Sequence, residues 1–571
     1  MVAGDVSFPD SLQELVRACS SFYRNNLEKI STEHVRQTRS KLSGFARVFH
    51  EQCGTLTPSV KERLEDLKGG HCIVLMTAHQ PNFFPYSGVL RKATLNFLLG
   101  EKLQELLEIP VVNFFGIADQ DFTDDKWVRT CQLPAVRRSG GTLSIEAKLP
   151  ERMMLNSVVK PSHDLVDGWK AQAEKWLDET IKSLKRLSKA LGLAEVCSSS
   201  SISVMHENLE LFWNTVEDCF ERSEKYSDFN AFMTSKIVNH LWEYDTVFAR
   251  FSECQQAFAE EFCFLLSHFK DYSRLLGEAE KIEGNESFGG GVSDQEPLLV
   301  PFWYHCDCGS KAKLFLTEKD RVLFGKGNCA NCQKHYDLEF GPEGNPSVSS
   351  IASKISARAI PMSLIFFSGL MPSCYVGGVA GTRYLAEAQH VAKGLGILFP
   401  PIAFWRPRDK YAGVGQLEAL LELRRVCDDL GAQNLSEARD LLMCRISKVR
   451  ECLSEIEKSK KILIEELRNS PDDQELKERF ISVSRSQTET CRSSHLSMIC
   501  YELKVIENVL AASSLIPSIM DYAVNVGLKE TSNQWIRHLC EKGSLEGDVC
   551  LESVLSRNEK LDSTMESSEL S

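Results

Sequence analysis

The stretch that decides the fold runs from residue 72 to residue 122 and reads CIVLMTAHQPNFFPYSGVLRKATLNFLLGEKLQELLEIPVVNFFGIADQDF. It contains two short apolar runs, Cys72–Met76 and Val111–Ile117, which are typical of strands buried in a parallel sheet. Between them, leucines recur at helical spacing at Leu95, Leu98, Leu99, Leu103 and Leu106. Strand, helix and strand at this spacing predict a right-handed crossover unit with parallel strands. The expected fold class is therefore α/β, with a Rossmann-like parallel-sheet core.

Polar side chains follow each of the two strands. The first loop supplies a hydroxyl, an imidazole and two carboxamides, and the second supplies two carboxylates: Thr77, His79, Gln80 and Asn82, then Asp119 and Asp121. Ligands of parallel sheets bind beyond the carboxyl ends of the strands, so these side chains are expected to line one pocket. The first loop also precedes a helix N-terminus, whose free N–H groups favour an anion. A plainer interpretation stays open, in which the aspartates cap the next element and His79 is a hydrogen-bonded loop residue.

A second α/β block surrounds a glycine-rich turn. Gly377 and Gly378 lead from a short strand into a helix, where backbone N–H groups can approach a phosphate or carboxylate. The alternative is that the glycines serve only to reverse the chain. Upstream, Lys354-Ile355-Ser356-Ala357 is similar to the loop by which class I synthetases hold ATP phosphates, although an ordinary exposed basic segment is the favoured interpretation.

Four cysteines stand close together in residues 298 to 340. Cys306 and Cys308 form one pair, Cys329 and Cys332 form another, and a hairpin-like stretch separates them. Four thiolates in two close pairs suit a closed, structural tetrahedral zinc site, so we expect a zinc-ribbon-like insertion. The alternatives are four unrelated reduced cysteines or a redox C-x2-C pair.

The remaining sequence has a mainly helical texture, including residues 169–277. Two long charged helices around the turn at 469–473 approximate coiled-coil spacing. The expected regions are an N-terminal helical segment (1–70), the first part of the core with a helical insertion (71–297), the zinc-ribbon-like insertion (298–340), the second part of the core (341–415), an antiparallel coiled-coil hairpin with terminal helices (416–541) and a disordered Ser- and Glu-rich tail (542–571).

The composition is that of a globular protein in a reducing compartment. The net charge of −13 argues against a general nucleic-acid binder, which needs clustered lysine and arginine. The most apolar window, 359–381, is broken by prolines, glycines and serines, so it predicts buried core rather than a membrane span. Twenty mostly scattered cysteines, without a secretory signal, favour a cytoplasmic location and no disulfide framework.

The quoted motifs resemble a known family, the cysteine-adding enzymes of bacillithiol biosynthesis. The segments that carry the resemblance, in the family's order, are Thr77-Ala78-His79-Gln80, Arg91-Lys92, Ala118-Asp119-Gln120-Asp121-Phe122, Tyr375-Val376-Gly377-Gly378, Tyr384 and 395–400. The piece HQPNFFPYSG also looks like the WbqC-like family, but the second block and the helical hairpin favour the first assignment. The sequence departs from the family's motifs at Ala78, Ala118, Gln120 and Gly381, and the four-cysteine segment looks like an insertion.

The resemblance implies a ligase that joins the carboxyl group of cysteine to an amino-sugar conjugate of the glucosaminyl-malate type. It implies catalytic roles for His79, Asn82, Asp119 and Asp121. Substrate- or nucleotide-binding roles fall to Thr77, Gln80, Lys92, Arg358, Gly377, Gly378 and Tyr384. ATP is a candidate activator, zinc is the expected structural metal, and the hairpin, which serves dimerisation in the family, implies a homodimer. Neither nucleic acid nor a membrane is an expected partner.

Two other functions stay open. One is a non-catalytic interaction protein, built on a decayed enzyme fold with a zinc ribbon and a coiled coil. The other is a class I synthetase-like, nucleotide-binding enzyme.

Overall fold

The core of the protein is a five-stranded parallel sheet in the order β12-β11-β1-β2-β5. The computed structural model describes residues 8–193, 196–283, 298–378, 381–493 and 495–556. The strands of this sheet are β1 (Ile73–His79), β2 (Val111–Ile117), β5 (Val247–Arg250), β11 (Cys374–Val376) and β12 (Ile402–Ala403).

The predicted crossover unit is confirmed. β1 leads through α5 (Ser87–Leu107) to β2, which pairs with β1 in parallel from Ile73 opposite Val111 to His79 opposite Ile117. Alternate residues of β1 enter the hydrophobic cores on the two faces of the sheet: Leu75 lies in one core and Val74 in the other. Burial on both faces is the reason why the strand is a continuous apolar run.

The strand order changes direction at β1. From β1 the chain moves to β2 and β5 on one side, and it later returns to β11 and β12 on the other side. The edge strand β5 is a correction to the sequence analysis, which expected only helices between residues 169 and 277. Its four residues, paired along β2, are too few for a period-2 pattern to stand out.

Helices surround the sheet. Four of them form the predicted N-terminal segment: α1 (Leu12–Asn25), α2 (Leu27–Ile30), α3 (Glu33–Cys53) and α4 (Pro58–Gly69). Those that follow in the core are α6 (Lys126–Arg129), α7 (His163–Ala190), α8 (Ser199–Arg222), α9 (Tyr226–Lys236), α10 (Phe251–Cys254), α11 (Ala259–Ser267), α12 (Phe269–Glu283), α13 (Ala359–Gly369) and α14 (Thr382–Leu395). None of the described helices combines the length and the apolar character needed to cross a membrane.

A second sheet carries the four cysteines. It is antiparallel, in the order β10-β6-β7-β8-β9, and we call it the cysteine-bearing sheet. Its strands are β6 (Leu299–His305), β7 (Lys311–Lys319), β8 (Val322–Cys329), β9 (His335–Pro342) and β10 (Ile355–Ala357). Residues 355–357 are the edge strand β10, paired with β6, and Lys354 forms an ion pair with Asp307, so the likeness of 354–357 to a synthetase phosphate loop is not borne out.

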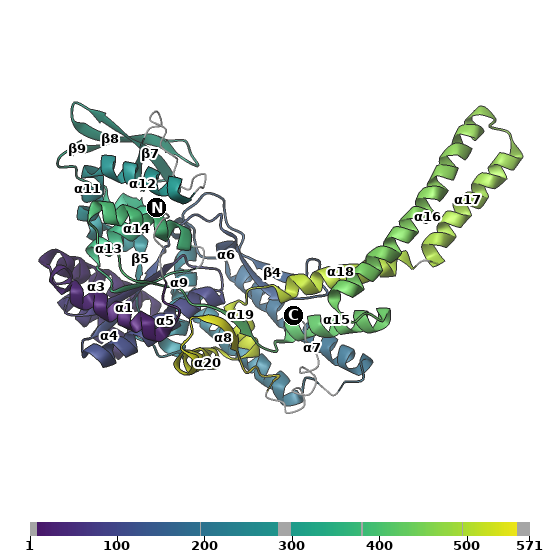
Figure 1. The fold of residues 1–571 in the computed structure, drawn as a ribbon, viewed down its shortest axis with the longest axis horizontal. Helices are drawn as coiled ribbons and strands as arrows, with labels where there is room; N and C mark the ends of the chain where they lie inside the picture. The colour runs from purple at the N-terminus through teal and green to yellow at the C-terminus, as the bar shows by residue number, and fades with distance from the viewer. Residues whose placement is uncertain (1–7, 194–195, 284–297, 379–380, 494, 557–571) are drawn as a thin grey trace.

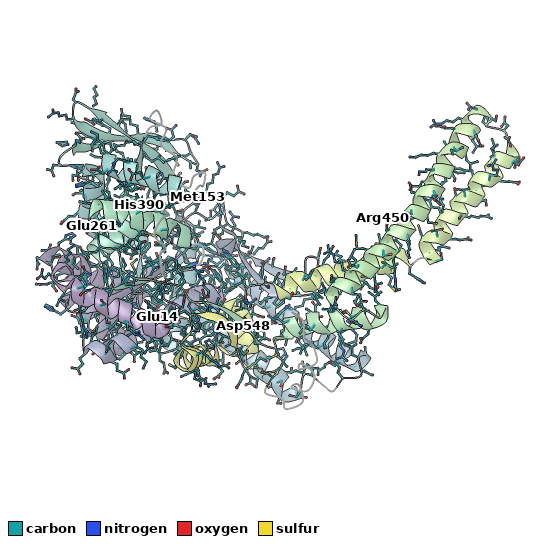
Figure 2. All side chains as sticks on the ribbon, viewed as in Figure 1. Glu14, Met153, Glu261, His390, Arg450 and Asp548 are labelled. Carbon is teal, nitrogen blue, oxygen red and sulfur yellow. The ribbon has the colours of Figure 1, made fainter. Side chains whose placement is uncertain are left out.

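A helical hairpin projects from the body of the molecule (Figure 1). It consists of α16 (Leu435–Asn469) and α17 (Gln474–Ser493), and it joins the body through α15 (Val414–Leu430) and α18 (Leu496–Ser513). The second predicted helix is interrupted at His495, whose φ of 51° is left-handed. Side chains stand out from the hairpin into solvent along its length, Arg450 among them (Figure 2).

The C-terminal part is more ordered than the sequence analysis expected. The predicted disordered tail (542–571) contains β14 (Glu546–Cys550), which pairs in parallel with β13 (Arg406–Lys410). Val549 is buried there, and this backbone pairing outweighs the polar composition of the segment. Residues 557–571 lie outside the described part of the chain. The remaining elements are the hairpin of β3 (Thr130–Pro134) and β4 (Thr142–Glu146), then α19 (Ile519–Asn525) and α20 (Leu528–Lys542).

Candidate functional site at the strand-order switch

The loops singled out from the sequence begin side by side at one edge of the parallel sheet. Thr77 of β1 lies opposite Val376 of β11, and the Ala118 N–H after β2 donates to the His79 carbonyl over 2.9 Å. This edge is also where the strand order changes direction, the usual ligand position in open parallel sheets. The structure thus brings the first loop, the aspartate loop and the glycine turn together.

Thr77 serves the sheet itself. Its hydroxyl is buried and donates to the Val376 carbonyl over 2.7 Å, which ties β1 to β11. At the helix start after the first loop, one N–H group and the carbonyl of the preceding proline are taken by a remote segment. The Ser87 N–H donates to the Pro517 carbonyl, and the Ile519 N–H donates to the Pro85 carbonyl. Residues 517–519 therefore cover the start of α5.

His79 is a neutral imidazole. Burial, assisted by the charge of Lys92, lowers the pKa of His79 to about 3. Nδ1 lies 3.0 Å from the Gln80 carbonyl and Nε2 lies 3.3 Å from the Tyr86 hydroxyl. A carbonyl only accepts, so Nδ1 carries the proton and Nε2 accepts from Tyr86. The half-buried Gln80 thus contributes its carbonyl to holding this ring.

Three carboxamides at this edge have buried atoms with unmet hydrogen bonds. Asn82 is 1% exposed, and neither its Oδ1 nor its Nδ2 has a partner among the described residues. Gln120 Oε1 and Asn156 Oδ1 are also buried without a hydrogen-bond partner among the described residues. The backbone N–H of Asn156 donates to the Asp119 carbonyl, which holds Asn156 beside the aspartate loop. Buried polar atoms are nearly always hydrogen-bonded, so these three amides are suited to a bound polar ligand or ordered water.

Asp119 is engaged by the protein. Its carboxylate accepts from the Ser252 N–H over 2.9 Å and from the Ser252 hydroxyl, at the start of α10. Burial raises the pKa of Asp119 to about 6, although the Ser252 hydrogen bonds and the charge of Arg250 oppose the shift. The capping interpretation thus fits Asp119, although the element it caps is α10 rather than the next one in sequence.

Asp121 is left available. It is half-buried, and no described residue forms a hydrogen bond or ion pair with its carboxylate. Burial raises its pKa, while the nearby charge of Lys311 opposes that shift. Its carbonyl accepts from the Leu155 N–H over 2.9 Å, which fixes the loop that carries it. Asp121 is therefore the carboxylate at this edge that can receive an amine or a proton.

Lys92 lies beneath the glycine turn. Its Nζ donates to the Ala78 carbonyl over 3.1 Å, and burial lowers its pKa to about 7. A Cβ added at Gly378 would lie 3.3 Å from Lys92 Nζ, whereas one at Gly377 would lie 2.6 Å from the ring of Phe404. Both glycines thus permit close packing, and Gly378 brings its backbone against the Lys92 amine.

Tyr384 and Arg358 are partly exposed residues at the outer side of the candidate site. The charge of Asp121 is among the causes that raise the pKa of Tyr384, after burial, which places this tyrosine near the aspartate loop. Arg358 stacks its guanidinium over the Trp303 ring at 4.9 Å, and Trp303 meets Phe122 edge-on at 6.0 Å. The Trp303 ring therefore lies between Arg358 and Phe122, which belongs to the aspartate loop.

Sequence reasoning missed two groups, Ser252 and Lys311. Ser252 binds Asp119 from the start of α10, in a segment that was expected to be helical but not to reach the aspartate loop. Lys311 belongs to the cysteine-bearing sheet, is 3% exposed and places its charge near Asp121. No local signal separates Lys311 from Lys313, the exposed lysine two positions along the same strand.

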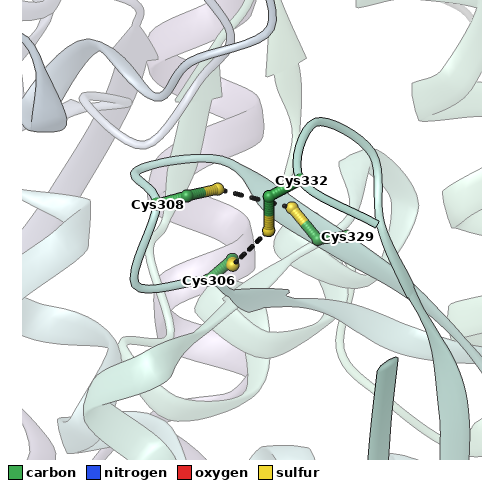
Figure 3. A group of neighbouring side chains, drawn as sticks. All are labelled: Cys306, Cys308, Cys329 and Cys332. Carbon is green, nitrogen blue, oxygen red and sulfur yellow. Dashed lines mark hydrogen bonds between the residues drawn. The ribbon is translucent and has the colours of Figure 1, made fainter. Parts of the chain in front are cut away.

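The four cysteine side chains converge (Figure 3). Their Sγ atoms all lie within 4.8 Å of one another. Cys306 Sγ is 3.5 Å from Cys332 Sγ, and Cys308 Sγ is 3.6 Å from Cys329 Sγ, so the thiols face each other without disulfide bonds. The predicted cluster is thus present, and it could hold a metal ion.

Comparison with known proteins shows no family. No family model matches the sequence, and no curated protein matches it. Among the solved structures that match is a Campylobacter jejuni protein named, provisionally, as an arginyl-tRNA synthetase. It is 10% identical, the match covers 82% of this chain and 92% of that chain, and the TM-score is 0.19. At that TM-score the likeness carries no argument about fold or function.

Proposed function

We propose that this protein is a carbon–nitrogen ligase that joins the carboxyl group of cysteine to the amine of an amino-sugar conjugate such as glucosaminyl-malate. One observation carries the proposal. At the strand-order switch, Asp121, whose carboxylate is unengaged, follows Gln120, whose amide oxygen lacks a hydrogen-bond partner among the described residues, on the same sheet edge as the buried amine of Lys92. Such a site suits a substrate that has both an ammonium and an anionic group.

The chemistry requires activation of the carboxylate, because amide formation from a free acid and an amine is uphill in water. ATP is the activator that we propose. The acceptor amine then attacks the activated carboxyl carbon, the C–N bond forms, and the phosphate or AMP leaving group departs. Asp121, whose pKa is raised by burial, takes the proton that the amine loses.

The other residues bind and orient the substrates. Lys92, which packs against the Gly377-Gly378 turn, would hold a carboxylate or phosphate group of the substrate. Arg358 and Tyr384 would cover the outer side of the bound substrate. Asn82 would donate to oxygen as negative charge develops, which is the role of preorganised donors in acyl transfer. Asp119 and the neutral His79 would keep the two loops in place.

We propose zinc for the cysteine cluster. Four Zn–S bonds of ~2.3 Å in a tetrahedron put sulfur atoms ~3.8 Å apart. The separations of the two facing Sγ pairs, 3.5 and 3.6 Å, are close to that edge and far longer than a disulfide bond. A site with four thiolates is closed, so the metal would be structural, and the free thiols throughout the chain fit a reducing cytoplasm.

We also propose that the helical hairpin pairs with a second copy of the chain. Large apolar side chains are exposed along it, at Met443, Ile462, Ile464 and Ile481. A mass by light scattering that is twice that of one chain would support this, and a monomer at all concentrations would exclude it.

The test of the ligase is direct. The protein is incubated with ATP, cysteine and glucosaminyl-malate, and the conjugate is sought by mass spectrometry. We expect a product with the summed mass of cysteine and glucosaminyl-malate less one water, which disappears when cysteine is omitted. A protein that is folded and carries its metal but yields no conjugate would contradict the proposal.

A further inference from the structure

Lys311 is a buried cation that the cysteine-bearing sheet presents to the aspartate loop. It is the first residue of β7 and lies directly opposite His305 of β6, so the two side chains share one face of the sheet. Lys313, two positions along, lies on the same face but is exposed. Lys311 itself is 3% exposed.

The surroundings of Lys311 leave its charge without a carboxylate in contact. Its Nζ lies 4.9 Å from the centre of the Phe122 ring, and no described acidic group is within ion-pair distance. Asp121 and Asp119 act on it only at longer range, and burial lowers the pKa of Lys311 to about 8. A buried ammonium in this state is costly unless it is paired.

Two polar side chains next to Lys311 also lack hydrogen-bond partners among the described residues. The buried Nε2 of His305, across the strand pair from Lys311, has no hydrogen-bond partner among the described residues. The hydroxyl of Ser310, next in the chain, is fully buried and equally without one. The start of β7 therefore has a positive charge and two polar side chains with unused hydrogen-bonding capacity.

Hydrogen bonds made by the two turns that carry the cysteines hold Lys311 in position relative to the aspartate loop. Its carbonyl accepts from the Ala330 N–H over 3.0 Å, between the two cysteines of the second pair. The carbonyl of Gly309, two positions before it, accepts from the Met154 N–H at 2.8 Å and from the Ser157 hydroxyl at 2.9 Å. The next residue, Leu155, donates to the Asp121 carbonyl. Met153, labelled in Figure 2, begins this bridging segment.

We infer that Lys311 is a substrate-binding residue that contacts an anionic oxygen, a carboxylate or a phosphate, of a molecule bound beside Asp121. This rests on the proposed function and adds to Lys92 and Arg358 a third cationic residue, supplied by the cysteine-bearing sheet. Lys92 would hold an anionic group on the β1 and β11 side, and Lys311 would hold one on the β2 side. The cysteine-bearing sheet would then form one wall of the active site.

The experiment compares Lys311→Met with the matched control Lys313→Met. Binding of three probes, L-malate, inorganic phosphate and ATP, is measured by titration calorimetry. Loss of a charged hydrogen bond should weaken binding of at least one probe about ten-fold or more in Lys311→Met, while Lys313→Met stays within about two-fold of the wild type. Equal binding by Lys311→Met and the wild type, or no binding of any probe by the wild type, would overturn the inference.

A second measurement covers the case in which Lys311→Met does not fold. In the wild type, acetylation of Lys311 by an amine reagent is followed by mass spectrometry with and without each probe. Slower labelling of Lys311 with a probe, at an unchanged rate for Lys313, supports the inference, and unchanged labelling of both overturns it. The conjugate assay separates the two claims. Probe binding through Lys311 without conjugate would defeat only the ligase, whereas conjugate formed at the wild-type rate by Lys311→Met would defeat only this inference.

Discussion

At the residue scale, two aspartates of one loop differ in what they contact. The carboxylate of Asp119 is buried and is held by the backbone and hydroxyl of Ser252, whereas that of Asp121 is half-buried and unengaged. The sequence predicts that both follow a strand, because a buried apolar run ends just before them. It cannot separate their roles, since Ser252 lies 133 positions away and only the tertiary fold brings it to Asp119.

The first prediction concerns Asp119→Ala. This change leaves the Ser252 N–H and hydroxyl without their acceptor in a buried place, so the free energy of unfolding should fall by about 1–3 kcal/mol. Urea denaturation measures it, with Asp472→Ala, an exposed residue in the turn between α16 and α17, for comparison. Equal stability of Asp119→Ala and the wild type would contradict a capping role for Asp119.

The second prediction concerns the charge of Lys92. Burial lowers its pKa to about 7, so the amine is cationic below that pH and neutral above it. If Lys92 holds an anion, kcat/KM for the ligase reaction should decline as the pH rises through about 7, because kcat/KM reports the free enzyme. Lys92→Met should be slower and should lack this inflection. The same inflection in Lys92→Met would assign it to another group.

At the scale of elements, the sequence predicts those whose pattern is long or strongly periodic. The crossover of β1, α5 and β2 is confirmed, as are the N-terminal helices. β5 and β14 could not be predicted, because each is short and becomes a strand only by pairing with a distant partner. The contact of residues 517–519 with the start of α5 could not be predicted for the same reason, since these residues are remote in sequence.

The third prediction tests the close approach of the glycine turn to Lys92. In Gly378→Ala the new Cβ would lie 3.2 Å from Lys92 Cε and 3.3 Å from its Nζ, so the amine must shift by a few tenths of an ångström. Because a flexible side chain can move, stability should change by less than about 1 kcal/mol, while the reaction slows markedly. Kinetics and thermal unfolding are measured together. Unchanged kinetics would show that this contact is not part of the site.

At the scale of the whole molecule, the cysteine-bearing sheet is joined to the candidate site. The carbonyl of Gly309, next to the cysteine cluster, accepts a hydrogen bond from Met154. The following residue, Leu155, donates its N–H to the Asp121 carbonyl. The cavity of about 820 Å³ at the base of the helical hairpin, lined by Arg137, Arg425 and Tyr501 among others, lies away from this site. Position in the sheet and unmet polar groups, rather than cavity size, therefore identify the candidate site.

The fourth prediction is that metal loss affects stability and activity together. We expect about one zinc per chain by elemental analysis, and a lower thermal midpoint with reduced activity after chelation or in Cys332→Ser. Cys444→Ser, an exposed cysteine of the hairpin, is the matched control and should leave both unchanged. Zinc near zero with all four thiols intact would refute the metal site.

The most direct test of the central claim compares conjugate formation by the wild type and by Asp121→Asn, with Asp124→Asn as the control. Conjugate from ATP, cysteine and glucosaminyl-malate is quantified by mass spectrometry, on proteins shown by circular dichroism to have the same fold. We predict that the wild type and Asp124→Asn form it and that Asp121→Asn loses at least about a hundred-fold in rate, the size of a general-base contribution. Conjugate formation at the wild-type rate by Asp121→Asn would contradict the account.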